Sequence, residues 1–406
     1  MNSRRWRSAV LTAAATGTIL LAAVGCSSTA PAASSSPLKI GASLPLTGPV
    51  ADVAKSGEQG YQLWASDVNS AGGLLGRKVS LDILDDGFDT NAVVTNYNKL
   101  ISEDKVDLLL GTFSSLTNAP ASAVAARQHM LYVEPSGGNG ALFTRGFTNL
   151  FFAQPGTTDT LPAPFVSYIT GLSKDKRPQT AAYLTQDDPS VAPALAIFQK
   201  KFEALGIKTV YSQTYPPTTK SFDPVASAIA AVKPDMIVQG AVTDDGVQFV
   251  RSLEKVAFSP KFLFQTQSPS DPAYPDAIGS GNEEGVFTAV GWSPDAKYPG
   301  NEAFVAGYTK TYGSAPSEDA ANSYTTGQVV AAAVKAVGSL NQAKLATWLH
   351  SHTVQTIVGP LKWDKTGVPI GSLLLAQWQG GTLKIVAPSS AATSSTTVSP
   401  KPNWQG

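Results

Sequence analysis

From residue 38 onward the chain alternates short apolar runs with longer amphipathic stretches, and this alternation restricts the fold more than any other feature. Between the first two runs, Gly60, Leu63, Trp64 and Val68 recur at helical spacing, and the segment "NSAGG" ends this predicted helix at a glycine. Buried strands that alternate with helices form parallel sheets covered by helices on both faces. The first four predicted strands are Leu38–Leu44, Lys78–Leu84, Val106–Phe113 and His129–Pro135.

The same alternation restarts after residue 160 and predicts a second set of strands, at Thr180–Asp188, Lys208–Tyr215, Pro234–Val242 and Lys261–Gln267. Two such sets predict an α/β protein with two Rossmann-like lobes of parallel sheet. The region that follows is too mixed to form a third domain, so we expect it to complete both lobes and to cross a multi-strand hinge. We predict lobe 1 at 38–152 with about 287–370, and lobe 2 at 153–286 with about 371–387.

The N-terminus is typical of a secretory signal. Arg4, Arg5 and Arg7 precede an uncharged run that is short for a membrane span, and Cys26 follows directly after small residues. We predict a signal peptide at 1–25, exported by either the general or the twin-arginine route. Cys26, the only cysteine, resembles the lipid-modified residue of a bacterial lipoprotein. A Ser- and Ala-rich tether at 26–37 and a disordered tail at 388–406 would flank the ordered body.

Charge and motifs exclude several classes of function. The 30 basic and 30 acidic residues balance, so no global field attracts nucleic acid. Pro45 and Pro49 bracket the turn after the first strand and remove backbone donors, which makes it a rigid lip and a poor phosphate site. The segment Gly279–Gly285 lacks dinucleotide spacing, and its two glutamates would repel a pyrophosphate. We therefore expect no nucleotide and no other cofactor.

An enzyme is equally poorly supported. The chain has no G-x-S-x-G elbow, and its three histidines, His129, His350 and His352, accompany no nucleophile or metal-ligand cluster. In open parallel sheets, ligands bind beyond the carboxyl ends of the strands. Two facing lobes therefore predict a ligand cleft between them, without catalysis and without a metal.

The stretch "IGASLPLTGPVADVAKSGEQGYQLWASDVNSAGGLLGRKVSLDILDD" resembles the opening of the leucine/isoleucine/valine-binding family of type I periplasmic binding proteins. The PLTG turn, the glycine-rich helix stop and the following DD pair occur in the family's order. "GTFSSLTNAPASAVA" and "GPLKWDKTGVPIG" are similar to a third-strand loop and a late hairpin of the family. The resemblance extends over residues 38–387 and implies the type I periplasmic binding fold.

The resemblance also implies ligand-binding positions. The third-strand loop would contribute hydroxyls for an oxygen-rich ligand end, and Phe113 or Trp292 would stack on the ligand or else belong to the core. Some of the hydroxyls could instead cap the following helix. The implied contacts in the first lobe are Phe113, Ser114, Ser115, Thr117, Ser136, Gly137 and Gly138, and those in the second lobe are Ser190, Thr243 and Gln267.

Gln267 stands where amino-acid binders of the family carry a glutamate that pairs with the ligand ammonium. A buried ammonium without a carboxylate partner is costly. Asp187 or Asp188 could compensate, but acids at those positions usually cap the next helix. We therefore expect an amide, a carboxylic acid or an aromatic acid rather than an ordinary α-amino acid.

The resemblance implies a monomeric, non-enzymatic lipoprotein outside the cytoplasm, anchored to the cell membrane through Cys26. It would capture a small-molecule solute and deliver it to the permease and ATPase subunits of an ABC importer of the branched-chain amino-acid type. An alternative is a sensory lipoprotein of the same fold that passes the ligand signal to a partner protein.

Overall fold

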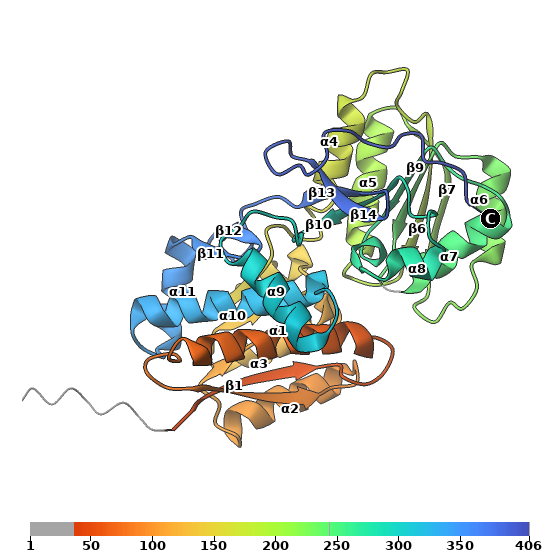
Figure 1. The fold of residues 1–406 in the computed structure, drawn as a ribbon. Coiled ribbons are helices and arrows are strands. Elements are labelled where there is room, and N and C mark those ends of the chain that lie inside the picture. The colour runs from red at the N-terminus through yellow and green to blue at the C-terminus, as the bar shows by residue number, and fades with distance from the viewer. Residues whose placement is uncertain (1–35, 243, 406) are drawn as a thin grey trace, which may run out of the picture. The chain divides into compact units, whose positions relative to one another are not determined.

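The structure is a computed structural model that describes residues 36–242 and 244–405 (Figure 1). Its first sheet is parallel and has the order β2-β1-β3, with a separate parallel pair formed by β4 and β5. The strands are β1 (Leu38–Leu44), β2 (Val79–Asp85), β3 (Leu108–Leu109), β4 (Tyr132–Glu134) and β5 (Leu150–Phe152).

Alternating side chains of these strands face two different cores. Ile40 and Val133 contribute to one core with helix α1 (Ala51–Ser70), whereas Leu109 and Tyr132 face helices α2 (Thr90–Ser102) and α3 (Ser114–Arg127). This period of two is the reason why a sheet buried on both faces reads as a continuous apolar run. A short 3₁₀ helix, η1 (Gly140–Thr144), lies between β4 and β5.

The second sheet has seven strands in the order β14-β13-β10-β9-β8-β6-β7. Strands β6 to β10 are parallel, and β13 and β14 continue the sheet as antiparallel strands. The strands are β6 (Thr180–Gln186), β7 (Lys208–Tyr215), β8 (Met236–Gly240), β9 (Phe262–Gln265), β10 (Val286–Val290), β13 (Leu374–Gln379) and β14 (Thr382–Ala387).

Helices cover both faces of this sheet. Met236 and Val238 of β8 pack with two helices on one face, α4 (Ala163–Gly171) and α5 (Ala192–Ala204). Ile237 points to the opposite face. That face is covered by α6 (Asp223–Val232), α7 (Asp244–Lys255) and α8 (Tyr274–Ile278), next to the 3₁₀ helix η2 (Ser268–Ser270).

The chain returns to the first core after β10. The returning elements are α9 (Asn301–Tyr312), α10 (Glu318–Val337), α11 (Gln342–Ser351), β11 (Val354–Thr356) and β12 (Gly359–Leu361). Their apolar side chains join those of α1 in one cluster, and α10 packs along α1 (Figure 1). The chain then enters the second sheet again at β13. The region after β10 thus contributes elements both to the first core and to the second sheet.

Two predicted boundaries differ from the structure. Residues 287–290 belong to β10 of the second sheet, because their backbone pairs with β9 and β13, and were predicted in lobe 1. The segment 388–405 was predicted to be a disordered tail, but its polar composition concealed several specific contacts. Trp404 Nε1 donates to the Phe258 carbonyl at 2.7 Å, and Lys401 N donates to the Lys261 carbonyl at 2.9 Å.

Candidate functional site

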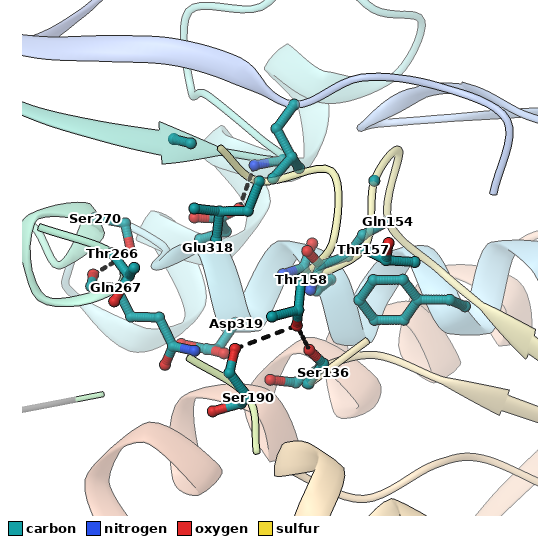
Figure 2. Close-up of a pocket in the computed structure, with 18 residues that line it drawn as sticks. Ser136, Gln154, Thr157, Thr158, Ser190, Thr266, Gln267, Ser270, Glu318 and Asp319 are labelled. Atoms are coloured by element: carbon teal, nitrogen blue, oxygen red, sulfur yellow. Dashed lines mark hydrogen bonds between the residues drawn. The ribbon is translucent and has the colours of Figure 1, made fainter. Parts of the chain in front are cut away.

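A pocket collects side chains from both halves of the described chain (Figure 2). It contains about 630 Å³ of space, part of it open to solvent. Its walls come from the loops after β4, β6 and β9, from the segments that connect the two halves, and from the first turn of α10. The residues with polar side chains in these walls are Ser136, Gln154, Thr157, Thr158, Ser190, Thr266, Gln267, Ser270, Glu318, Asp319 and Asn322.

Thr158 joins two of these loops. Its Oγ1 lies 3.0 Å from the carbonyl oxygen of Gly137 and 3.2 Å from that of Ser190. Ser190 is itself held by Asp188, whose carboxylate accepts from both its backbone N–H and its hydroxyl. Hydrogen bonds from Thr158 thus connect the loops after β4 and β6 in the pocket wall (Figure 2).

Two carboxyl groups, those of Glu318 and Asp319, enter the pocket from the start of α10. Ser317 caps this helix by accepting from the backbone N–H of Ala320, which directs the next two residues toward the pocket. Glu318 Oε1 accepts from the Gly291 backbone N–H at 2.5 Å. Burial raises the pKa of Glu318 to about 8 and that of Asp319 to about 7, and repulsion between neighbouring acids adds to both shifts.

The sequence-predicted contacts are only partly brought together. Ser136, Gly137, Ser190 and Gln267 line this pocket. Phe113 lines a smaller neighbouring hollow, which Ser136 also reaches. Ser114, Ser115, Thr117 and Gly138 are not among the lining residues of the pocket. Thr243 and Cys26 lie outside the described residues.

The hydroxyls of the third-strand loop are occupied within their own segment or by the loop after β4. Ser114 Oγ accepts from the Leu116 N–H, Thr117 Oγ1 donates to the Phe113 carbonyl, and Ser115 Oγ accepts from the Asn139 N–H. Ser and Thr near a helix start commonly satisfy such local groups, so their presence in a loop does not by itself predict a ligand contact.

Other predictions have structural outcomes as well. Trp292 donates from Nε1 to Asn301 Oδ1 and packs edge-on against Phe304, so it belongs to the core. Glu318, Asp319 and Asn322 were missed because "PSEDAAN" has the pattern of an ordinary helix start with acids in its first turn. A search of the helix starts beside the predicted hinge, as well as of strand ends, would have included them.

A more open hollow adjoins the pocket and shares Gln267, Ser270, Glu318 and Asp319 with it. Its other walls come from the starts of α1 and α7, the loop after β9, α8, and the segment from α9 to α10. Besides Glu318 and Asp319, its charged lining residues are Asp52, Lys55, Asp244 and Asp271, and Lys55 lies 3.7 Å from the Asp52 carboxylate. The approach to the pocket is therefore predominantly acidic.

Within residues 36–242 and 244–405, no helix has the length and apolarity required to cross a bilayer. No three His, Cys, Asp or Glu side chains are grouped there so that they could hold a metal ion.

Comparison with known proteins decides the family. The family model described as periplasmic binding protein matches residues 37–382, which is most of the chain. This chain belongs to the periplasmic binding protein family. The resemblance to Leu/Ile/Val-binding proteins predicted from the sequence is confirmed as well, and the family is one of solute-binding proteins rather than enzymes.

Curated relatives match at low identity over nearly their full length. An amino acid binding protein of Pseudomonas aeruginosa is 27% identical over 84% of this chain and 89% of its own length. The Leu/Ile/Val-binding protein BraC3 of Rhizobium johnstonii is 28% identical over 86% of this chain and 93% of its own length.

Solved structures confirm the predicted type I periplasmic binding fold. The branched-chain amino acid transporter substrate-binding protein LivJ from Streptococcus pneumoniae, in complex with isoleucine, has a TM-score of 0.76 at 18% identity and covers 86% of this chain and 97% of its own. A solute-binding protein of an ABC transporter from R. palustris, in complex with benzoate, has a TM-score of 0.75 at 21% identity, with coverages of 91% and 98%.

Proposed function

We propose that this protein is the extracytoplasmic solute-binding component of an ABC importer of the branched-chain amino-acid type. It captures a small organic solute in the pocket between two lobes and delivers it to permease and ATPase subunits. The observation that carries the proposal is a pocket built from both halves of a periplasmic binding fold. Lobes that close on a solute would do so because contacts from both sides exist only in the closed form.

The names of the relatives support the transport role. The Pseudomonas protein is described as binding amino acids. The structure with isoleucine is a branched-chain amino acid transporter substrate-binding protein, and the structure with benzoate is a solute-binding protein of an ABC transporter. We propose lobe 1 as 38–152 with 291–370 and lobe 2 as 153–290 with 371–405. Within the pocket we propose Ser136, Gly137, Ser190 and Gln267 as solute contacts, and Thr158 as the residue that positions their loops.

A thermal-shift screen tests the binding role. Amino acids, amides, amines, aromatic acids and polyols are each added to the purified protein, and the melting temperature is measured. A solute that binds only the folded state stabilises it by RT ln(1 + [L]/Kd), about 2.7 kcal/mol at a hundredfold excess over Kd. We expect a saturable increase for one class. No increase for any class, or chemical turnover of a bound compound, would contradict the proposal.

The membrane anchor is tested separately at Cys26, the proposed lipid-modified residue. A Cys26→Ser variant has no thiol to acylate, so we expect the protein to move from the membrane fraction to the soluble extracytoplasmic fraction. Ser27→Ala is the control and should remain in the membrane fraction. Immunoblots of the two fractions measure the distribution, and a Cys26→Ser protein that stays with the membrane would show that the thiol is not the anchor.

A further inference from the structure

The charges that line the pocket are all of one sign. Glu318 and Asp319 are its ionisable side chains, and no Lys, Arg or His is among the described residues that line it. Acids in the first turn of a helix are stabilised by the helix dipole, and this explains why the sequence tolerates them there. The helix dipole does not explain why both carboxyls face one pocket in which none of the described lining residues is basic.

Asn322 provides an independent observation in the same place. It lies one helical turn after the two acids, so all three side chains fall on one face of α10 and line the pocket together. Asn322 is 2% exposed, and no described residue donates a hydrogen bond to its Oδ1. A buried carbonyl oxygen without a donor is costly, so this position is suited to a donor on the ligand.

The groups that could bind an anion are directed elsewhere. The N-terminus of α3 would be the natural place for a ligand carboxylate, but the loop after β4 lies against it. A Cβ built on Gly137 would be 2.3 Å from the Ser115 backbone nitrogen, and Asn139 N donates to Ser115 Oγ at 3.1 Å. This helix end is therefore covered by the protein's own backbone.

We propose that the solute is a net cation: it carries a protonated amine or amidine that binds Glu318 and Asp319, donates to Asn322 Oδ1, and bears no carboxylate. This inference rests on the proposed binding function and specifies its substrate class. It replaces the expectation that the solute is an amide or an acid. That expectation was based on Gln267, which stands where amino-acid binders of the family carry a glutamate. The structure places two carboxyls in the same pocket as Gln267, on a different element.

Binding of such a cation is coupled to protonation. The pKa values of Glu318 and Asp319, about 8 and 7, leave both carboxyls partly protonated near neutral pH when the pocket holds no cation. A bound ammonium favours the ionised carboxylates, so protons are released when it binds. A ligand without a positive charge would release none from this site.

Matched compounds test the charge requirement. The butyl, 3-methylbutyl and benzyl skeletons are each offered as amine, alcohol and carboxylate, together with leucine and 4-aminobutyrate as zwitterions and CaCl₂ as a metal cation. Affinities are measured by isothermal titration calorimetry on the purified full chain. We expect the tightest binder to be an amine, and we expect its binding near pH 7 to release protons, as measured in two buffers of different ionisation enthalpy.

Substitutions then locate the charge. In Glu318→Gln and Asp319→Asn we expect amine affinity to fall roughly 10- to 100-fold, the usual cost of losing a charge-assisted hydrogen bond. The number of protons released on amine binding should decrease in the same variants. Glu302→Gln, at an exposed acid in the first turn of α9, is the control and should bind like the wild type. Melting temperatures show whether each variant is folded, and a folded variant that binds the amine normally would overturn the inference.

The outcomes separate this inference from the proposed function. If an alcohol, a carboxylate or a zwitterion binds more tightly than every amine, the protein is a solute-binding protein but the cation inference is wrong. Binding of Ca²⁺ in preference to the amines would overturn it as well. If no compound in this panel or in the broader screen binds, the proposed function itself fails.

Discussion

Replacing Gly60 with alanine is expected to lower the free energy of unfolding by about 1–3 kcal/mol, the usual cost of overpacking a core. Gly60 lies where α1 crosses α10. A Cβ at this position would be 2.2 Å from the carbonyl oxygen of Ala320 and 2.9 Å from its carbonyl carbon. Because both atoms belong to the backbone, no side-chain rotation relieves the contact, and the two helices must separate.

The same substitution should weaken solute binding, because Ala320 directly follows Glu318 and Asp319. Gly171→Ala is the matched control: nothing lies within 4 Å of its Cβ position at the end of α4, so its unfolding free energy should change little. Urea unfolding followed by circular dichroism measures both variants. An unchanged midpoint for Gly60→Ala would show that the helix contact is not tight.

The second large effect concerns Glu134 and pH. Its side chain is fully buried, and no side chain of the described residues hydrogen-bonds to either carboxylate oxygen. Burial raises the pKa of Glu134 to about 8, although the charge of Arg145 and the backbone N–H of Gly138 oppose the shift. The folded protein therefore keeps a proton that the unfolded chain loses above pH 4.5, the ordinary value for a glutamate.

The folded state binds more protons than the unfolded state between these two pKa values, so stability falls as the pH rises from about 4.5 to about 8. For Glu134 alone, the loss is on the order of 4 kcal/mol. Glu318 and Asp319 act in the same direction when no cation is bound. We expect the melting temperature of the ligand-free protein to decrease over this pH interval.

The glutamine of Glu134→Gln does not titrate. The melting temperature of this variant should therefore increase relative to that of the wild type as the pH rises across the same interval. Glu302→Gln serves again as the exposed control and should follow the wild-type curve. Thermal unfolding from pH 5 to pH 8 measures all three proteins. Parallel curves for the wild type and Glu134→Gln would mean that the Glu134 carboxyl is already ionised in the folded state.

The fold was largely predictable because its signals are local. Each of the eight predicted strands overlaps an observed strand, since period-two burial on a two-sided sheet produces recognisable apolar runs. The exact bounds differ because apolar residues continue beyond the hydrogen-bonded pairs, as in the run Val106–Phe113, where only Leu108–Leu109 form β3.

The site was less predictable because it is assembled by long-range packing. Ser136, Gly137, Ser190 and Gln267 follow strands, where ligands of parallel sheets bind, and the family resemblance implied them as contacts. Glu318 and Asp319 reach the pocket only because α10 packs on α1, more than 250 residues earlier in the chain. No local sequence pattern predicts the packing of α10 on α1.

This late return of the chain also affects synthesis. Tyr61 and Trp64 of α1 share a core with Val330, Leu345 and Trp363. A ribosome must therefore translate nearly the whole polypeptide before the first half can cover its apolar helix face. Contacts so distant in sequence slow folding, and until they form the nascent protein presents exposed apolar surface to chaperones.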